Sequence, residues 1–357
     1  MRIAVTRTDV PFVTGGAERH SANLVKALQE HGHEAAEVAI PFRWHPGQIL
    51  VEHVMAAKLI DLGHFAGDPI DMMIGLKFPA WLARHPNKVF WVLHQHRQAY
   101  DLWDSGISDL LHDPDGAAVR GLIRAEDAAS LGAPGARIYA NSGNVAARLA
   151  KYNGIAATPL YHPPPNAERL RAGPYGDYLF APGRLNPLKR QDLMIEAMAH
   201  ARKLAPGAKL VLAGPSDDAG HTRALKERVT ALGLEDCVTF TGAIPDAEMV
   251  RLYAEARAVV FTPVDEDYGY ITLEAMLSAR PVIVTTDSGG PLEFIRDGQE
   301  GCVTAPEPAA LGAAFARLTE DAGLAERMGA AAAARYAGLG IGWETVVETL
   351  VRAGQGT

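Results

Sequence analysis

The sequence predicts an α/β protein with two Rossmann-like, doubly wound parallel sheets. Short apolar runs that fit buried strands alternate with helical patterns along the chain, as they do in βαβ units. A chain of 357 residues is too long for one ordinary core, so we expect two domains. The three prolines at residues 163–165 stiffen the backbone and cannot extend a sheet, which suits a boundary between domains.

Composition and charge exclude several classes of protein. Hydrophobic residues make up 48% of the chain and charged residues 21%, as expected for a globular protein in water. The net charge of −8 argues against general affinity for nucleic acid. The amino terminus enters a strand without the apolar stretch of a signal peptide, and no run is as long as a membrane span. We expect a cytoplasmic protein, with peripheral membrane contact left open and with Cys237 and Cys302 reduced in its core.

The first domain is placed at residues 1–165. Apolar runs bounded by turn residues predict strands at residues 3–6, 34–40, 70–74, 89–93 and 137–140. Helical patterns lie between these strands, through Leu24 and Leu28, over residues 49–62 and over residues 145–152.

The loop at residues 14–19 contains two glycines, Gly15 and Gly16, directly before a predicted helix. Glycines let backbone N–H groups approach an anion or a sugar, although a plain turn explains the same pattern. The loop lacks the spacing G-x-G-x-x-G, which argues against a dinucleotide-binding oxidoreductase.

Polar side chains follow the fourth predicted strand. His94 and His96 emerge where we expect the carboxyl edge of the sheet, and either one fits a site histidine or a structural hydrogen-bonding residue. Arg97 suits a phosphate or a charged acceptor. Tyr100 and Trp103 suit either the stacking of a sugar or simple packing.

Two other loops of the first domain are candidates for ligand contact. The loop at residues 41–46 is aromatic and basic, so it fits either a docking site for an acceptor or a loop packed on its own domain. Lys77 follows the end of another predicted strand.

The second domain is placed at residues 166–340. Strands are predicted at residues 178–181, 209–213, 238–241, 258–261 and 282–285, and a helix is predicted through Glu293 and Ile295. The tail, residues 341–357, predicts an amphipathic helix. Its apolar face carries Trp343, Val346, Val347 and Leu350.

The most informative stretch is residues 265–281, a loop and a short helix between two buried strands. Its loop leaves the carboxyl end of a strand, where open α/β sheets bind ligands. Glu266 lies in the loop and Glu274 on the first turns of the helix, and a tight turn at Gly269 can bring both carboxylates to one pocket. Two acceptors beside a positive helix end suit a nucleotide sugar, which carries hydroxyls and phosphates. Simple compensation of the helix dipole is the alternative.

A pair of cations follows the first predicted strand of the second domain. Arg184 and Lys189 lie five residues apart, and both can point at one anion. A bidentate arginine and a lysine suit the charge of a diphosphate, although charged loop residues are commonly just solvated.

These motifs resemble the retaining glycosyltransferases of family 4, the glycosyl transferases group 1, which have the GT-B fold. The resemblance rests on the spacing E-x7-E from Glu266 to Glu274, on the glycines at residues 289–290, and on Gly-Arg-Leu-x3-Lys from Gly183 to Lys189. It covers most of the chain and is strongest over residues 183–293. It implies two domains that face an interdomain cleft, with the terminal helix packed back on the first domain.

The resemblance also implies roles for single residues. Glu274 is expected to bind the ribose hydroxyls of the donor, and Glu266 to lie beside the donor sugar. His94 is expected close to the donor sugar and the acceptor hydroxyl, while Arg184 and Lys189 stabilise the leaving diphosphate. The other donor-binding residues it implies are Gly15, Gly16, Gly183, Gly214, Ala243, Ile244, Tyr268, Gly269, Tyr270 and Ile271.

The reaction that the resemblance implies is transfer of a hexose from a UDP- or GDP-linked sugar to a hydroxyl of a saccharide or lipid-linked acceptor. Retention, no cofactor and no metal are expected, so Asp265 and Asp267 are not expected to form a metal site. No residue stands out as a covalent nucleophile, so front-face displacement is expected. A nucleotide-sugar epimerase and a non-catalytic nucleotide-sugar binding protein remain alternatives. The donor base, the sugar, the acceptor and the oligomeric state are not determined by the sequence.

Overall fold

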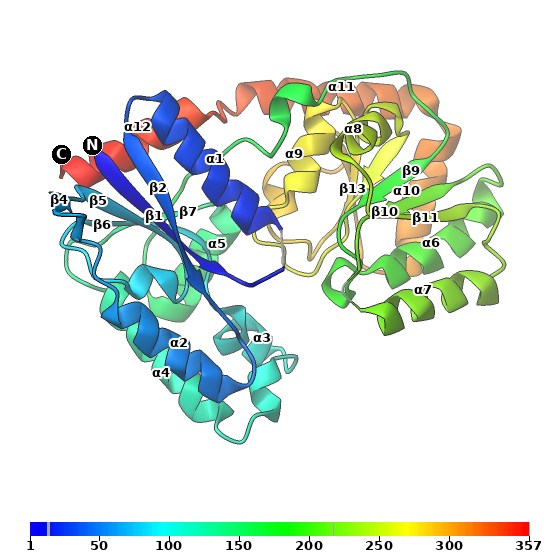
Figure 1. Cartoon of the computed structure of the whole chain (residues 1–357). Helices are drawn as coiled ribbons and strands as arrows, with labels where there is room; N and C mark the ends of the chain where they lie inside the picture. Colours follow the sequence, from blue (N-terminus) through cyan, green and yellow to red (C-terminus); the bar gives the residue numbers. More distant parts are fainter. Residues whose placement is uncertain (13–14, 217, 357) are drawn as a thin grey trace. The chain divides into compact units, whose positions relative to one another are not determined.

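The chain divides into two compact units (Figure 1). The computed structural model describes residues 1–12, 15–216 and 218–356. The first unit comprises Met1–Pro165 together with Gly342–Thr357, and the second comprises Asn166–Ile341. Each unit contains one six-stranded sheet.

The sheet of the first unit has the strand order β2-β1-β5-β6-β7-β8, and all neighbouring strands are parallel. The strands are β1 (Arg2–Asp9), β2 (Glu34–Pro41), β5 (Met72–Lys77), β6 (Lys88–His94), β7 (Arg137–Ala140) and β8 (Thr158–Pro159). The helices are α1 (Gly16–Glu30), α2 (Gly47–Leu59), α3 (Asp101–Asp104), α4 (Gly116–Leu131), α5 (Gly143–Asn153) and α12 (Trp343–Gln355). The strand order reverses between β1 and β5, which makes their carboxyl ends the expected place for a ligand.

Short elements complete the first unit. They are the hairpin β3 (His64–Phe65) and β4 (Asp68–Pro69), and the 3₁₀ turns η1 (Ala80–Leu82), η2 (Arg97–Ala99) and η3 (Asp109–His112). The hairpin was not predicted, because strands of two residues carry no periodicity to detect.

Both faces of the first sheet are covered, as parallel sheets require. On one face Val5, Leu24 and Trp91 pack with Val346 and Leu350 of α12, and all five are almost fully buried. The apolar face of α12 therefore lies in the core of the first unit. A second core forms on the other face, around Leu50, Phe90 and Ile123.

The sheet of the second unit has the order β11-β10-β9-β12-β13-β14, again all parallel. The strands are β9 (Leu179–Pro182), β10 (Leu210–Ala213), β11 (Val238–Gly242), β12 (Ala258–Val260), β13 (Val282–Thr285) and β14 (Gly301–Thr304). The helices are α6 (Gln191–Leu204), α7 (Ala219–Ala231), α8 (Asp246–Glu255), α9 (Tyr270–Leu277), α10 (Pro308–Glu320) and α11 (Ala322–Gly338), with the 3₁₀ turns η4 (Ala167–Arg169), η5 (Pro187–Lys189) and η6 (Gly290–Glu293). The order reverses between β9 and β12.

Two predictions about this unit can be compared with the structure. Cys237 and Cys302 are buried and form no disulfide, as predicted. The helix predicted through Glu293 and Ile295 is wrong, because the chain forms only the 3₁₀ turn η6 there. Among the helices that the structure describes, none has the length and apolar character needed to cross a membrane.

The carboxyl ends of β9 and β10 approach each other through two glycines. Gly183 and Gly214 have positive φ angles of +125° and +148°. A Cβ atom on Gly214 would overlap the carbonyl oxygen of Gly183. Glycine at residue 214 is therefore required both by its backbone conformation and by this close approach.

Replacing Gly214 should destabilise the second unit more than replacing a glycine with open surroundings. We expect Gly214→Ala to lower the free energy of unfolding by roughly 3 kcal/mol, because strain and overlap add. Gly233→Ala is the matched control, since Gly233 also has a positive φ but a Cβ there meets no atom within 4 Å. It should cost about 1 kcal/mol. Equal losses in urea denaturation would contradict the close approach.

Candidate functional site

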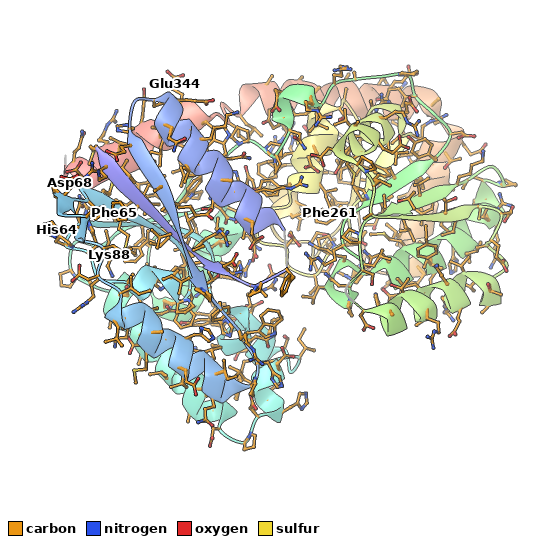
Figure 2. The ribbon with its side chains drawn as sticks, viewed as in Figure 1. His64, Phe65, Asp68, Lys88, Phe261 and Glu344 are labelled. Carbon is orange, nitrogen blue, oxygen red and sulfur yellow. The ribbon has the colours of Figure 1, made fainter. Side chains whose placement is uncertain are left out.

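The loops that follow β9 and β12 are joined by an ion pair at the carboxyl edge of the second sheet. Lys189 comes after β9 and Glu266 after β12, and the Lys189 ammonium donates a hydrogen bond to the Glu266 carboxylate. The Lys189 nitrogen also lies 5.1 Å from the ring centre of Phe261, which Figure 2 labels. The two charged side chains are 21% and 25% exposed, so both remain within reach of a ligand.

Local hydrogen bonds determine where this pair lies. The Asn186 side chain accepts a hydrogen bond from the Lys189 N–H at 3.2 Å, which fixes the turn η5. The amide of Gln191 donates to the carbonyl of Arg184 at 3.1 Å. The two loops also meet directly, because the Val264 N–H donates to the Leu188 carbonyl at 2.8 Å.

The Glu266 loop is paired with the segment after β13. The Glu266 N–H donates to the Ser288 carbonyl at 2.9 Å, and the Gly290 N–H donates to the Glu266 carbonyl at 2.8 Å. The N–H group of Gly290 is therefore used within the loop. Arg190 strengthens the same junction by donating to Asp287 at 2.8 Å and to the Pro263 carbonyl at 2.9 Å.

Burial and Arg190 act in opposite directions on Asp287. Burial alone would raise the pKa of the Asp287 carboxyl, but the hydrogen bond and charge of Arg190 lower it below its ordinary value. Asp287 is therefore the ionised partner in this contact.

Glu274 lies in α9, directly after the turn that the sequence placed at Gly269. Gly269 has a φ of +88°, and a Cβ there would lie 2.8 Å from the Pro291 side chain, so glycine is required. The Glu274 carboxylate accepts a hydrogen bond from the Tyr253 hydroxyl at 2.6 Å. Burial, together with the charge of Glu274, raises the pKa of Tyr253 far above its usual value, and the same causes raise the pKa of Tyr270.

Tyr253, on α8, is a residue that sequence reasoning missed. Its ring is buried and only its hydroxyl requires a polar partner. An aromatic residue on the apolar face of a helix indicates such a need, but only the structure shows that Glu274 meets it.

The other residues predicted to contact the donor lie at the same edge of the second sheet. Gly183, Gly214 and the pair Ala243–Ile244 follow β9, β10 and β11, while Tyr268 to Ile271 surround the first turn of α9. Asp265 has a positive φ of 44°. Within the described ranges, no three His, Cys, Asp or Glu side chains lie together as a metal site requires.

In the first unit, Gly15 and Gly16 begin α1 at the carboxyl edge of the sheet. Gly15 is the N-cap residue, and its N–H donates to the Glu18 carboxylate at 2.8 Å. That N–H is therefore used by the helix itself. Thr14, which precedes these glycines, lies outside the described residues.

The structure distinguishes the two candidate histidines. His94 is the last residue of β6 and lies opposite Lys77 of β5. Its Nδ1 atom lies 2.6 Å from the Gln95 carbonyl, which places the proton on Nδ1 and leaves Nε2 as the basic nitrogen. His96 is instead buried between the rings of Phe42 and Phe78, with 8% exposure. Burial lowers the pKa of His96 to about 3. Of the two, His94 is the better candidate.

A buried chain of hydrogen bonds holds the residue next to His94. The Gln95 amide donates to the Asn153 side chain, and Asn153 donates to the Tyr100 hydroxyl at 3.1 Å. Tyr100 donates to Asp127 at 2.7 Å, and the Trp81 indole donates to the other Asp127 oxygen at 3.2 Å. Tyr100 is fully buried, so of the two roles that the sequence left open, stacking of a sugar and simple packing, the structure supports packing. It supports the segment that carries His94.

Two other candidates of this segment have partners within the first unit. Arg97 forms an ion pair with Asp101 at 2.6 Å. The Arg120 guanidinium lies over the Trp103 ring, 5.0 Å from the ring centre. Both contacts help to hold the segment that follows β6 in place within the first unit.

Comparison with known proteins identifies the second unit. Residues 169–335 match the family described as glycosyl transferases group 1. The second unit is a group 1 glycosyl transferase domain. The matched segment contains the two cations Arg184 and Lys189 and the two carboxylates Glu266 and Glu274.

Curated relatives match a similar part of the chain. A D-inositol 3-phosphate glycosyltransferase of Nocardia farcinica is 31% identical over 238 residues, which cover 61% of this chain and 52% of the relative. A mannosylfructose-phosphate synthase of Agrobacterium fabrum is 37% identical over 126 residues, which cover 34% of this chain and 28% of the relative. The chain spans about half the length of the D-inositol 3-phosphate glycosyltransferases it matches.

Solved structures extend the likeness to both units. The Anabaena protein HepE in complex with UDP and glucose has a TM-score of 0.72 at 18% identity, with 100% of each chain covered. The sucrose-phosphate synthase of Thermosynechococcus elongatus has a TM-score of 0.76 at 18% identity, with 99% of this chain and 98% of that chain covered. The two parallel-sheet domains are thus those of the GT-B fold class, as predicted.

The buried carboxyl of Asp127 predicts a pH dependence of stability. Burial raises its pKa to about 7 in the folded chain, against roughly 4 for an exposed aspartate. Between these pH values the folded protein keeps a proton that the unfolded chain has released. The free energy of unfolding should therefore fall as the pH rises from about 4 to about 7.

Urea denaturation between pH 5 and pH 8 tests this expectation. Asp127→Asn removes the titrating group, so its stability profile should be flatter than that of the wild type. Asp115→Asn, at the exposed start of α4, is the control and should keep the wild-type profile. Parallel profiles for the wild type and Asp127→Asn would contradict the assignment.

Proposed function

We propose that the chain is a retaining glycosyltransferase. It moves a hexose from a nucleoside diphosphate sugar to a hydroxyl group of an acceptor, without a metal ion. The observation that carries this proposal is the pairing of Lys189 with Glu266 where the strand order of the second sheet reverses. Open α/β sheets bind ligands at this position, and the pair offers one cation and one acceptor there.

Each chemical group of the donor is assigned to residues of the group 1 domain. Lys189 and Arg184 bind the diphosphate, as a point charge and a planar fork of donors. Glu274 accepts from the ribose hydroxyls, and the Tyr253 hydroxyl orients its carboxylate. Glu266 accepts from hydroxyls of the donor sugar. Backbone groups at residues 243–244 meet the base.

The Lys189–Glu266 pair prepares the site for an anionic ligand. Before the donor binds, each charge compensates the other, so neither is left unpaired in a half-buried place. The diphosphate then takes over as partner of Lys189, and Glu266 is left to accept from neutral sugar hydroxyls rather than to face a phosphate.

The reaction breaks the bond between the anomeric carbon and the diphosphate oxygen. The acceptor oxygen forms its bond to the same face of that carbon, and the acceptor proton passes to the leaving diphosphate. Arg184 and Lys189 stabilise the negative charge that develops on the leaving group. In the first unit, His94 presents the basic Nε2 to a sugar hydroxyl, since its Nδ1–H is bonded to the Gln95 carbonyl.

The comparisons support this proposal without deciding the substrates. The relatives named as a glycosyltransferase and a synthase support sugar transfer. The UDP and glucose bound to the Anabaena protein support a UDP-linked hexose as donor. A GDP-linked hexose is the second candidate, and a saccharide or a lipid-linked hydroxyl is the proposed acceptor.

Removing the charge of Glu274 should weaken binding of the nucleotide. Glu274→Gln keeps an acceptor for Tyr253 but loses the ionised carboxylate, so affinity for UDP or GDP should fall about tenfold in calorimetry. Tyr253→Phe is the matched variant, because it keeps the carboxylate and removes only the hydroxyl that orients it. We expect a smaller loss. Unchanged affinity in Glu274→Gln would reject its role with ribose.

Removing the two cations should slow turnover rather than only weaken binding. Arg184→Ala combined with Lys189→Ala should reduce release of nucleoside diphosphate in the presence of acceptor by roughly 10²-fold or more. Lys203→Ala, an exposed lysine of α6, is the control for loss of positive charge in the same unit. Near-normal turnover in the double variant would reject the diphosphate role.

The wild-type assays also separate the alternatives. Conversion of the nucleotide sugar with no acceptor present would indicate an epimerase. Binding of the nucleotide sugar in calorimetry, with no release of nucleoside diphosphate to any acceptor, would indicate a binding protein.

A further inference from the structure

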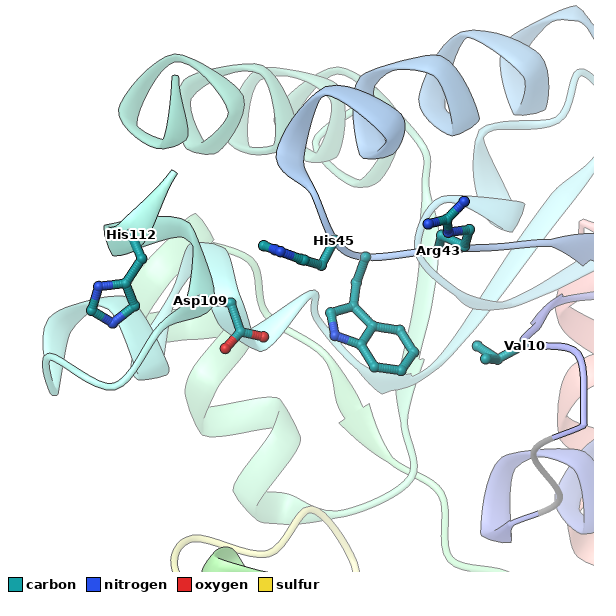
Figure 3. A pocket seen from close by; sticks show the side chains of 6 residues that line it. Val10, Arg43, His45, Asp109 and His112 are labelled. Atoms are coloured by element: carbon teal, nitrogen blue, oxygen red, sulfur yellow. The ribbon is translucent and has the colours of Figure 1, made fainter. Parts of the chain in front are cut away.

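A pocket of about 500 Å³ lies in the first unit and has no occupant in the function proposed above (Figure 3). Val10 lines it from the end of β1, residues 43–45 from the end of β2, and Asp109 and His112 from η3. In Figure 3, His45 and Asp109 project into the same space from different segments. A volume of this size accommodates a small ligand.

The walls of the pocket are fixed by hydrogen bonds beneath its surface. The Phe42 N–H donates to the Asp9 carbonyl at 2.7 Å, and the Phe42 ring is buried. Gln98 holds the turn η3 from two sides, since its amide donates to Asp109 at 3.1 Å and its side-chain oxygen accepts from the Asp109 N–H at 2.7 Å. A preformed site of this kind loses little conformational entropy when a ligand binds.

The exposed groups of the pocket combine an aromatic face with positive charge. Trp44 is 43% exposed, which is unusual for so large an apolar ring and provides a face for a sugar ring to stack on. Arg43 is exposed, and no acidic side chain among the described residues forms an ion pair with it. The imidazoles of His45 and His112 add two further groups that can donate hydrogen bonds to a ligand.

Two carboxylates lie in or next to the pocket, and each already accepts a hydrogen bond from within the protein. Asp109 accepts from Gln98 with one oxygen, so its other oxygen is available to a hydroxyl group. Asp113, whose carboxylate lies 3.9 Å from the His45 ring, accepts from the Gly47 N–H at 2.7 Å. Arg43 supplies the permanent positive charge among the residues that line the pocket, and its planar fork of donors suits a phosphate or a carboxylate on a ligand.

The pocket is connected to the segment that carries His94. Gln98, which holds Asp109, lies four residues after His94, and the Phe42 ring contacts the ring of His96 at 6.0 Å. The wall of the pocket and the segment that carries His94 are therefore packed against each other within the first unit.

We propose that this pocket binds an anionic sugar, a ring that carries a phosphate or a carboxylate, as the acceptor of the reaction. The Trp44 indole stacks on the ring, Arg43 binds the anionic group as a planar fork, and Asp109 accepts from a hydroxyl. This inference rests on the proposed function and names the class of its second substrate.

Calorimetry on the full chain tests it with matched ligands. The anionic probes are glucose 6-phosphate, fructose 6-phosphate, glucuronate and galacturonate, and the controls are glucose, fructose, galactose and inorganic phosphate. We expect at least one anionic sugar to bind about tenfold or more tightly than both its neutral parent and phosphate alone. Absence of binding by every anionic sugar would overturn the proposal.

Variants then locate the bound sugar. Arg43→Gln should weaken the anionic sugar about tenfold or more, and Trp44→Leu should weaken anionic and neutral sugars alike. Arg223→Gln, on exposed α7, and Phe65→Leu, a 73% exposed aromatic residue, are the matched controls and should bind like the wild type. Affinity for the nucleotide sugar in the same variants reports that each one is folded. Binding that is equal in the wild type and both pocket variants would overturn the proposal.

Two further comparisons complete the test. The first distinguishes a free anionic sugar from a lipid headgroup as the ligand of the pocket, and the second distinguishes failure of this inference from failure of the proposed glycosyltransferase function. Vesicles of phosphatidylcholine with and without phosphatidylinositol test a lipid headgroup. Binding to the anionic vesicles that depends on Arg43 and Trp44, with no binding of free sugars, would assign the surface to a membrane and overturn the proposal. If nucleotide sugars bind and react but no anionic sugar binds, only this inference fails. If no nucleotide sugar binds or reacts, the proposed function fails, and the acceptor role fails with it.

Discussion

The ion pair between Lys189 and Glu266 is the interaction on which the rest of the second unit depends. It joins two loops that are 77 residues apart in the chain but adjacent in space, because β9 and β12 are neighbours in the sheet. A lone charge at such a half-buried place would be unfavourable, so each residue requires the other until a ligand arrives. The strand order thus creates both the ligand position and the charges that serve it.

In the first unit, His94 is held in place by a network of hydrogen bonds rather than by an ion pair. His94 is oriented by the carbonyl of Gln95, whose side chain is in turn bonded to Asn153. The chain continues through Tyr100 to the buried Asp127. These hydrogen bonds hold the side chains in place, and burial of the carboxyl at the end of the network raises the pKa of Asp127. The adjacent pocket with Trp44 and Arg43 is fixed by a similar set of backbone and amide bonds.

Much of the fold was predictable because its signals are local. Every strand predicted from an apolar run is present within a few residues, since parallel strands covered on both faces are almost continuously apolar. Elements without such a signal were missed or wrong. The two-residue strands of the hairpin after α2 have no periodicity, and the helix predicted after Gly290 is reduced to a turn whose first N–H bonds to Glu266.

The sequence by itself determined the α/β class, the positions of most strands, the glycine turn before α9, and the charged residues that follow the strand ends. Those features depend on backbone conformation and on the spacing of apolar residues, which neighbours along the chain decide. The tertiary structure alone decided that Tyr253 is the partner of Glu274, that His96 is buried while His94 is partly exposed, and that three separate segments line the pocket with Trp44 and Arg43. Each of these depends on which distant segments the strand order brings together, and no local pattern records that.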